Sequence, residues 1–158
     1  FGGHKLAAGV RLEPNQLERF REAFEQVVAD ELGGQPLTPA LLLECELDFQ
    51  QASDSAFLQE LELMQPFGAG NAEPVFASPE LTVVDRSPLG YSGDHVRLRL
   101  KDSASGITLM AKGWNMATAF PPSSVGSRIR VAYTPRLDYY RGVASIDVGI
   151  KDWQPVAD

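Results

Sequence analysis

The stretch MQPFGAGNAEPVF, residues 64–76, divides this chain into two parts with different hydrophobic periodicity. A helical repeat runs into the stretch, and strand-like alternation follows it. Pro66 cannot continue a helix, because proline lacks a backbone N–H and fixes φ. Gly68 and Gly70 allow backbone angles that residues with a Cβ avoid, and Asn71 can hydrogen-bond locally. The stretch therefore predicts an elbow of defined shape, either purely structural or with a backbone that also contacts a ligand.

Two motifs carry a resemblance to a known family. QPFGAGNAEPVF resembles the PFGxGNPEPVF motif of the RecJ family of single-strand-specific exonucleases, with Ala72 where that family usually has Pro. Residues 2–9, GGHKLAAG, match the GGHxxAAG motif of the DHH-associated domain. The second motif alone indicates only a superfamily, because small phosphodiesterases and the tail of alanyl-tRNA synthetases share it. With the elbow and a β-rich tail behind it, it favours the RecJ family.

The resemblance implies the C-terminal portion of a 5′-to-3′ exonuclease of DNA repair and recombination. The family uses Mn²⁺ or Mg²⁺ held by a DHH domain, and the motif of that domain is not in this sequence. We therefore expect no catalytic residue, metal site or cofactor here, and a chain that binds single-stranded DNA without cutting it. The implied partners are single-stranded DNA and, as an open alternative, a single-strand-binding protein or another repair protein. Two rival functions are a protein-docking scaffold and part of a phosphodiesterase acting on oligonucleotides or cyclic dinucleotides.

The composition is that of an ordinary globular chain. Its 158 residues allow one domain or two small ones, and 44% of them are hydrophobic. No apolar run approaches the ~20 residues that span a bilayer. The chain opens at Phe1 with neither an initiating Met nor a signal peptide, so we expect part of a longer cytoplasmic protein. The single Cys45 excludes an internal disulfide, and its apolar neighbours predict a buried thiol.

The net charge of −7 is unevenly distributed. Residues 1–79 contain 4 Lys and Arg against 13 Asp and Glu, whereas residues 80–158 contain 10 against 8. The first part is therefore strongly acidic and the second slightly basic. Because local charge steers a polyanion more than the chain average does, the second part is the candidate for binding nucleic acid.

Gly2, Gly3 and His4 predict a tight loop near the N-terminus. Two glycines let a backbone approach a ligand closely and direct N–H groups at it, as in many phosphate sites. From the residues alone, an ordinary loop with a hydrogen-bonded histidine is the simpler interpretation. The resemblance to DHH proteins implies instead that these three residues bind the substrate phosphate.

The rest of the acidic part predicts two helices and a strand. Residues 15–32 have a helical repeat, with Asn15 as N-cap and Glu18 at capping-box spacing. Residues 41–49 predict a strand with a solvated carboxylate face rather than a metal site. Ser53 or Asp54 should cap a second helix that ends at the elbow.

After the elbow, five segments predict strands: residues 81–86, 95–101, 107–113, 128–135 and 143–150. A short helix led by Asn115 is expected between the third and fourth. Trp114 and Trp153 could stack on bases, but the position of Trp114 before that helix favours a residue that plugs the core. This order is the layout of an OB barrel. We predict an α+β chain: the end of an α/β DHH-associated domain at 1–36, a linking strand, helix and elbow at 37–74, and a five-stranded OB-like barrel at 75–158.

The second predicted strand carries the clearest pattern for binding. Val96, Leu98 and Leu100 alternate with Arg97, Arg99 and Lys101, which places three cations on one face. The other candidates are Lys112 on the next strand and, in the loop after the fourth strand, Arg136, Tyr139, Tyr140 and Arg141. Cations along a groove with aromatic residues are typical of single-strand binding. The alternative is a solvated outer face whose charges pair with acids.

Overall fold

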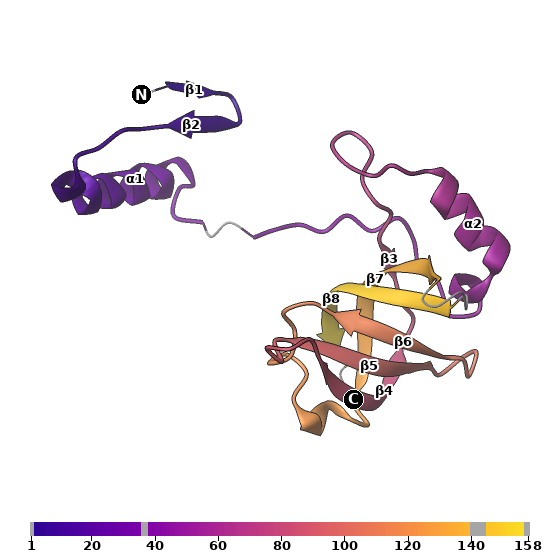
Figure 1. Ribbon diagram of the computed structural model, residues 1–158. Coiled ribbons are helices and arrows are strands. Elements are labelled where there is room, and N and C mark those ends of the chain that lie inside the picture. Colours follow the sequence, from indigo (N-terminus) through magenta and orange to yellow (C-terminus); the bar gives the residue numbers. More distant parts are fainter. Residues whose placement is uncertain (1, 36–37, 140–144, 157–158) are drawn as a thin grey trace. The chain divides into compact units, whose positions relative to one another are not determined.

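Two separate units make up the chain, divided between Leu41 and Leu42 (Figure 1). The computed structural model describes residues 2–35, 38–139 and 145–156. The elbow lies within the second unit, which also includes most of the segment 37–74. No helix in the described part of the chain is both long and apolar enough to cross a membrane.

The first unit begins with a hairpin. Strand β1 (Gly2–His4) pairs antiparallel with β2 (Ala7–Gly9), and Gly3 lies opposite Ala8. A Cβ added at Gly3 would lie 3.0 Å from the Cβ of Ala8, so the glycine permits this close approach. The loop that we predicted at Gly2–His4 is therefore wrong: these residues form a strand, because their backbone pairs with that of 7–9.

Helix α1 (Leu17–Glu31) confirms the predicted helix, but its start differs. Residues Pro14–Gln16 form a short 3-10 turn, so Asn15 lies within that turn instead of capping α1. Gln16 occupies the N-cap position and makes no side-chain capping bond. Gly33 and Gly34, with φ of 58° and 73°, end the helix, because both lie in the left-handed region.

The second unit is a barrel with the predicted OB arrangement. Its strands are β3 (Phe76–Ala77), β4 (Leu81–Leu89), β5 (His95–Asp102), β6 (Thr108–Gly113), β7 (Arg128–Asp138) and β8 (Ser145–Pro155). The order is β3-β7-β4-β5-β6-β8, and the β7–β8 pairing closes the barrel. Strands β6 and β8 are parallel, and the other neighbours are antiparallel. The expected α+β class and OB-like barrel are confirmed, and the two-residue β3 is added to the five predicted strands.

Alternation along β5 builds much of the core. Val96, Leu98 and Leu100 are fully buried, while the residues between them face solvent. The helix predicted after β6 is wrong: residues 114–119 form turns, and the strained position is Asn115, with φ of 56°. Arg86 fixes this segment by donating from Nε to the carbonyl of Phe120 at 2.8 Å. Phe120, rather than Trp114, is the residue buried in the core.

The segment before α2 (Ser55–Leu63) covers part of the barrel. The strand predicted at 41–49 is wrong, because this segment forms only one bridge, from Glu46 to Ala77. Phe49 is fully buried and meets Tyr133 edge-on at 5.9 Å between ring centroids. Cys45 is exposed, contrary to the buried thiol that we expected.

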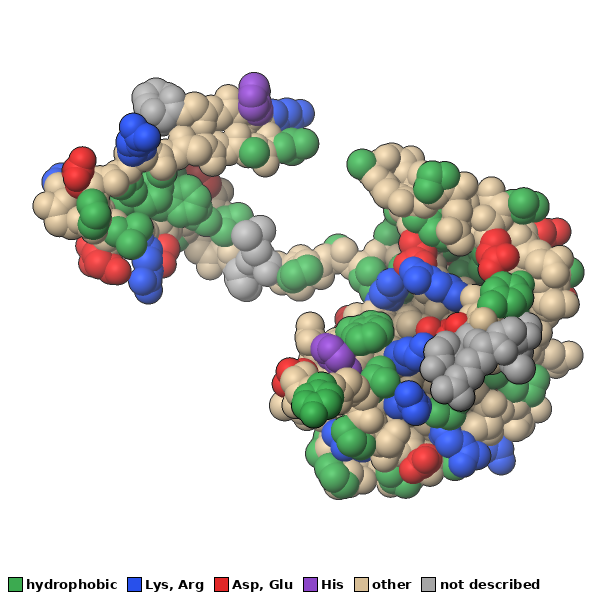
Figure 2. All heavy atoms as spheres, in the orientation of Figure 1, with side chains coloured by type: hydrophobic (Ala, Val, Ile, Leu, Met, Phe, Trp, Pro, Cys, Tyr) green, Lys and Arg blue, Asp and Glu red, His purple; other side chains and the backbone are tan. Residues whose placement is uncertain are grey.

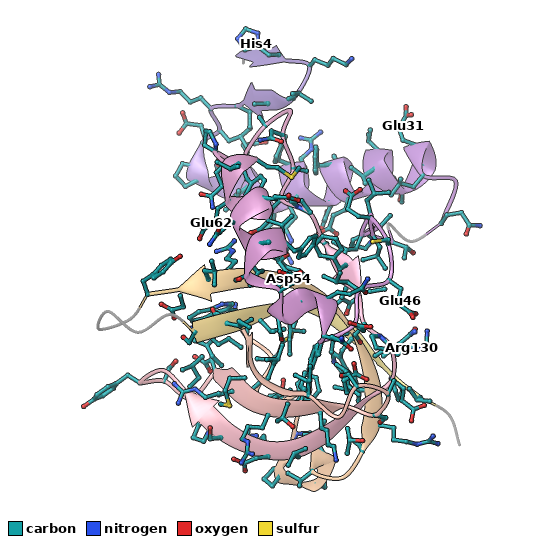
Figure 3. The ribbon with its side chains drawn as sticks, turned by 90° about the vertical axis from the view of Figure 1, so that its right-hand side faces the viewer. His4, Glu31, Glu46, Asp54, Glu62 and Arg130 are labelled. Atoms are coloured by element: carbon teal, nitrogen blue, oxygen red, sulfur yellow. The ribbon has the colours of Figure 1, made fainter. Side chains whose placement is uncertain are left out.

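Asp54 caps α2, as one of the two predicted candidates, by accepting from the N–H of Ala56 at 2.8 Å (Figure 3). After the helix, Asn71 closes the elbow. Its Nδ2 donates to the carbonyls of Met64 and Pro66, each at 2.9 Å. Local hydrogen bonding by Asn71 is thus confirmed as the means by which the elbow holds its shape.

Candidate nucleic-acid interface

The exposed face of β5 carries the predicted row of cations. Arg97, Arg99 and Lys101 are all exposed, as the alternation predicted. Within the part of the chain that the structure describes, no carboxylate forms an ion pair with any of these three side chains. Asp85 is the cross-strand neighbour of Arg99 on β4 and is the nearest acid by register. Figure 2 shows Lys and Arg side chains following one another down one face of this unit.

Lys112 extends the row onto β6, where it lies directly opposite Arg97. Two adjacent cations repel one another unless acids or an anionic ligand offset them. Here Nζ of Lys112 lies 3.0 Å from Asp147 and 3.8 Å from Asp138. Lys112 is therefore partly neutralised, whereas Arg97 beside it is not.

A groove of about 570 Å³ lies beside Arg97 and Lys112. Its lining comes from strands β4 to β8 and the turn after β6: Leu89, Arg97, Met110, Lys112, Trp114, Asp138, Ser145, Ile146 and Asp147. Arg99 and Lys101 continue along β5 from Arg97 but do not line the groove. A groove that combines cations with apolar and aromatic side chains can bind both the phosphates and the bases of a single strand.

A second hollow of about 320 Å³ adjoins the groove, because Trp114 and Asp147 line both. Arg136 and Lys151 line this second hollow. Both are held by Glu73 of the elbow, which accepts from Arg136 Nε at 2.8 Å and from Lys151 Nζ at 3.0 Å. Burial alone would raise the pKa of Glu73, but its hydrogen bonds and charge interactions with Lys151 and Arg136 outweigh burial and lower that pKa.

The favoured prediction for Trp114, a residue that plugs the core, is wrong. Its side chain is 57% exposed instead of plugging the core. It lines both hollows, so it lies where they adjoin. The sequence signal that could have predicted an exposed Trp114 is the order Gly113-Trp114-Asn115. An Asn in the left-handed region turns the chain directly after the strand.

The loops at the ends of the strands carry further aromatic residues. Tyr91, in the turn between β4 and β5, is fully exposed and was not among the predicted site residues. Tyr139 is 59% exposed and follows the last residue of β7. The predicted candidates Tyr140 and Arg141 lie outside the described residues.

The other predicted site residues belong to the first unit. Gly2, Gly3 and His4 form β1, and all three are exposed. Figure 3 shows the His4 side chain pointing away from β2. The structure therefore brings Arg97, Lys112 and Arg136 together around adjoining hollows, and it leaves the Gly-Gly-His motif in a separate unit.

The described residues provide no group of three or more His, Cys, Asp or Glu side chains that could hold a metal ion. The donors needed for a Mn²⁺ or Mg²⁺ site are thus not gathered in this part of the chain.

Solved structures show where this fold occurs. The crystal structure of RecJ in complex with Mn²⁺ from Thermus thermophilus matches with a TM-score of 0.60 at 23% identity, over 89% of this chain and 20% of that one. The Mg²⁺ complex of the same protein matches with a TM-score of 0.59 at 24% identity, over 89% and 21%. These similarities show the fold.

Sequence comparisons give the family. The single-stranded-DNA-specific exonuclease RecJ of Haemophilus influenzae is 28% identical over 99% of this chain and 27% of its own length. RecJ of Bacillus subtilis is 20% identical over 96% of this chain and 19% of its own length. The chain thus spans about a quarter or less of these relatives. The family model described as the RecJ OB domain matches residues 43–152. Since that match covers the barrel and the segment leading into it, the chain belongs to the RecJ OB domain family.

Proposed function

We propose that the barrel binds single-stranded DNA across the outer face of β5, β6 and β8, as the substrate-holding part of a RecJ-like 5′-to-3′ exonuclease. The observation that carries the proposal is the exposed row Arg97, Arg99 and Lys101, which leads into a groove lined by Lys112 and Trp114. Binding of oligonucleotides by OB folds uses the face of the second and third strands and the loops beside it. In this barrel those strands are β5 and β6.

The charges of this face suit a single strand. Exposed cations without carboxylate partners attract phosphates, while an aromatic ring in the groove offers a stacking surface for a base. A duplex keeps its bases stacked on one another, so the ring would gain no base from it. Single-stranded DNA is also the substrate class in the names of the RecJ relatives.

The remaining parts of the proposal concern the longer protein. Cleavage would take place in another domain, with Mn²⁺ or Mg²⁺, as expected from the metals in the RecJ crystal structures. The His4 motif would contact a substrate phosphate near that site. The protein would work in the cytoplasm in DNA repair and recombination. A single-strand-binding protein or another repair protein remains a proposed second partner.

Fluorescence anisotropy with a labelled thymidine oligonucleotide tests the DNA-binding role. Arg97→Ala should weaken binding and make the plot of log affinity against log salt shallower by about 0.7, the value per phosphate of a single strand. Arg130→Ala is the matched control, because Arg130 is a half-exposed cation on β7 that pairs with Glu46 and lines neither hollow (Figure 3). Equal effects of the two substitutions would mean that binding is diffuse, and no binding by the unaltered chain would favour a protein-docking role.

A further inference from the structure

His95, the first residue of β5, touches Trp114 and the residue that follows it. The two rings meet edge to face, with centroids 4.7 Å apart and planes at 70°. Nδ1 of His95 accepts a hydrogen bond from the backbone N–H of Asn115 at 3.0 Å. His95 therefore holds Trp114 in two ways, through the ring itself and through the backbone next to it.

The backbone around this contact leaves the imidazole little freedom. Gly90 has φ of 83°, and a Cβ there would lie 3.2 Å from Cδ2 of His95. On the other side, the carbonyl of Asp94 accepts from the N–H of Ala117 at 3.1 Å, which ties the turn after Trp114 to the start of β5. The imidazole is thus confined between the β4–β5 turn and the turn after β6.

The hydrogen bond also fixes the chemistry of the imidazole. Because Nδ1 accepts, the neutral ring carries its proton on Nε2. Asn115 is in the left-handed region, which is uncommon for a residue with a Cβ. An acceptor for its N–H stabilises that conformation, and the conformation determines where Trp114 projects. No other part of the barrel face has an exposed tryptophan among the described residues.

We propose that His95 is a positioning residue that orients Trp114 as a stacking surface for one base of a bound single strand. This inference rests on the proposed DNA-binding function and adds a role for a residue that contacts no phosphate. A stacked base gains more from a ring whose plane is already set, since ordering a mobile side chain opposes binding. His95 supplies that order before DNA arrives.

The first measurement uses the free chain, in a Trp153→Phe background so that Trp114 alone reports. His95→Phe keeps an aromatic ring but removes the acceptor, whereas His95→Asn keeps an oxygen at the position of Nδ1. The quenching of Trp114 by acrylamide should change in His95→Phe, which loses the acceptor, and should change less in His95→Asn, which loses only the ring contact. Unchanged Trp114 signals in His95→Phe would overturn the positioning role, whatever the chain binds.

The second measurement is a double-mutant cycle with a thymidine oligonucleotide. Trp114→Ala should weaken binding about fivefold to a hundredfold, the range for loss of one stacked base. His95→Phe should weaken it by no more than that, with an unchanged salt slope, and should have no further effect in the Trp114→Ala background. Additive effects, or a shallower slope in His95→Phe, would overturn the proposal, because His95 would then contact the strand itself.

Failure of the two ideas gives different results. If the unaltered chain binds no oligonucleotide, the proposed function fails and the stacking role fails with it, while the acrylamide measurement still shows whether His95 orients Trp114. If the chain binds but the cycle is additive, the proposed function stands and only the inference about His95 falls. A variant that is unfolded by circular dichroism is replaced by His95→Leu, which also lacks the acceptor.

Discussion

Nζ of Lys112 lies 3.0 Å from a carboxylate oxygen of Asp147, between the parallel strands β6 and β8. Both side chains are about three-quarters covered, at 28% and 25% exposed. The pair lies inside the proposed DNA-binding groove. Asp147 therefore disfavours the binding of a phosphate there in two ways: its negative charge repels the phosphate, and its ion pair with Lys112 competes with the phosphate for that ammonium group.

Replacing Asp147 by Asn should therefore strengthen binding of single-stranded DNA. Lys112 then keeps only its longer contact with Asp138, at 3.8 Å, and can contact one more phosphate, so the salt slope should become steeper by up to about 0.7. Glu46→Gln is the matched control, because it also releases a cation, Arg130, but outside both hollows. Salt titrations of DNA binding by the two variants test this prediction. Weaker binding by Asp147→Asn would mean that the ion pair between Lys112 and Asp147 keeps the groove in a shape that binds DNA, instead of lowering its affinity.

Removing Arg97 and Arg99 together should make the salt slope shallower by about 1.4, twice the value for one phosphate of a single strand. Folding should change little, because both side chains are exposed and surface charges contribute only ~0–1 kcal/mol per pair. The check is a salt titration together with a urea melt. An unchanged slope in a folded double variant would leave the row as an ordinary solvated face and favour the scaffold role.

The cation row and the barrel order could be predicted because they depend on local alternation. Each buried residue of β5 fixes the outward direction of the next one, so Val96 and Leu98 were enough to place Arg97. The ion pairs of the neighbouring cations Lys112 and Arg136 could not be predicted in the same way. Asp147 and Glu73 reach Lys112 and Arg136 only after distant segments have packed together.

Trp114 and the segment 41–49 were misjudged for a related reason. The exposure of Trp114 depends on the left-handed turn at Asn115 and on a contact with His95 from another strand. Residues 41–49 alternate like a strand, but β3 offers them only two residues to pair with. Periodicity gives the direction of side chains, and whether a partner strand exists is decided by the tertiary structure.

Tyr91→Ala and Tyr139→Ala should each weaken DNA binding with almost no change in salt slope, because stacking releases no counterions. Loss of a stacked base costs about 1–3 kcal/mol of binding free energy. Tyr91 is fully exposed and Tyr139 is 59% exposed, so the melting temperature should not fall. A third exposed apolar side chain, Leu63 of α2, provides the control Leu63→Ala, which should leave affinity unchanged.

The carboxylate of Asp102 joins the β5–β6 turn to the segment before α2, and this makes folding sensitive to acid. It is fully buried and accepts from the N–H groups of Phe49, Ala104 and Ser105 and from the Ser105 hydroxyl. Burial alone would raise the pKa of Asp102, but these hydrogen bonds outweigh burial and lower that pKa. The group therefore stabilises the fold above the unfolded pKa of about 3.9.

That stabilisation should be lost as the pH falls through the lowered pKa of Asp102. Asp102→Asn should cost about 1–3 kcal/mol at neutral pH, because its amide NH₂ faces donors on one side. The difference in unfolding free energy between wild type and variant should shrink toward acid pH. Urea melts from pH 7 to pH 3 measure it, and a pH-independent difference would mean that the charge of Asp102 is not what stabilises the turn.

His4→Ala tests the proposed phosphate contact in the first unit. His4 is exposed on β1, and among the described residues no hydrogen bond or ion pair involves its imidazole, so removal of the ring should leave the melting temperature unchanged. If His4 contacts a substrate phosphate, its loss should lower kcat/KM by about tenfold or more, as expected for one charged hydrogen bond of about 1.5–3 kcal/mol. The enzyme for this test is a protein that carries this chain together with a DHH nuclease domain.

Lys5→Ala, in the neighbouring turn, is the control for a general loss of positive charge. The assay is release of nucleotides from a 5′-labelled single strand with Mn²⁺ present. Full activity of His4→Ala, or an equal loss in Lys5→Ala, would remove the specific phosphate role and leave the Gly-Gly-His strand with a structural one, in which Gly3 permits close packing on Ala8.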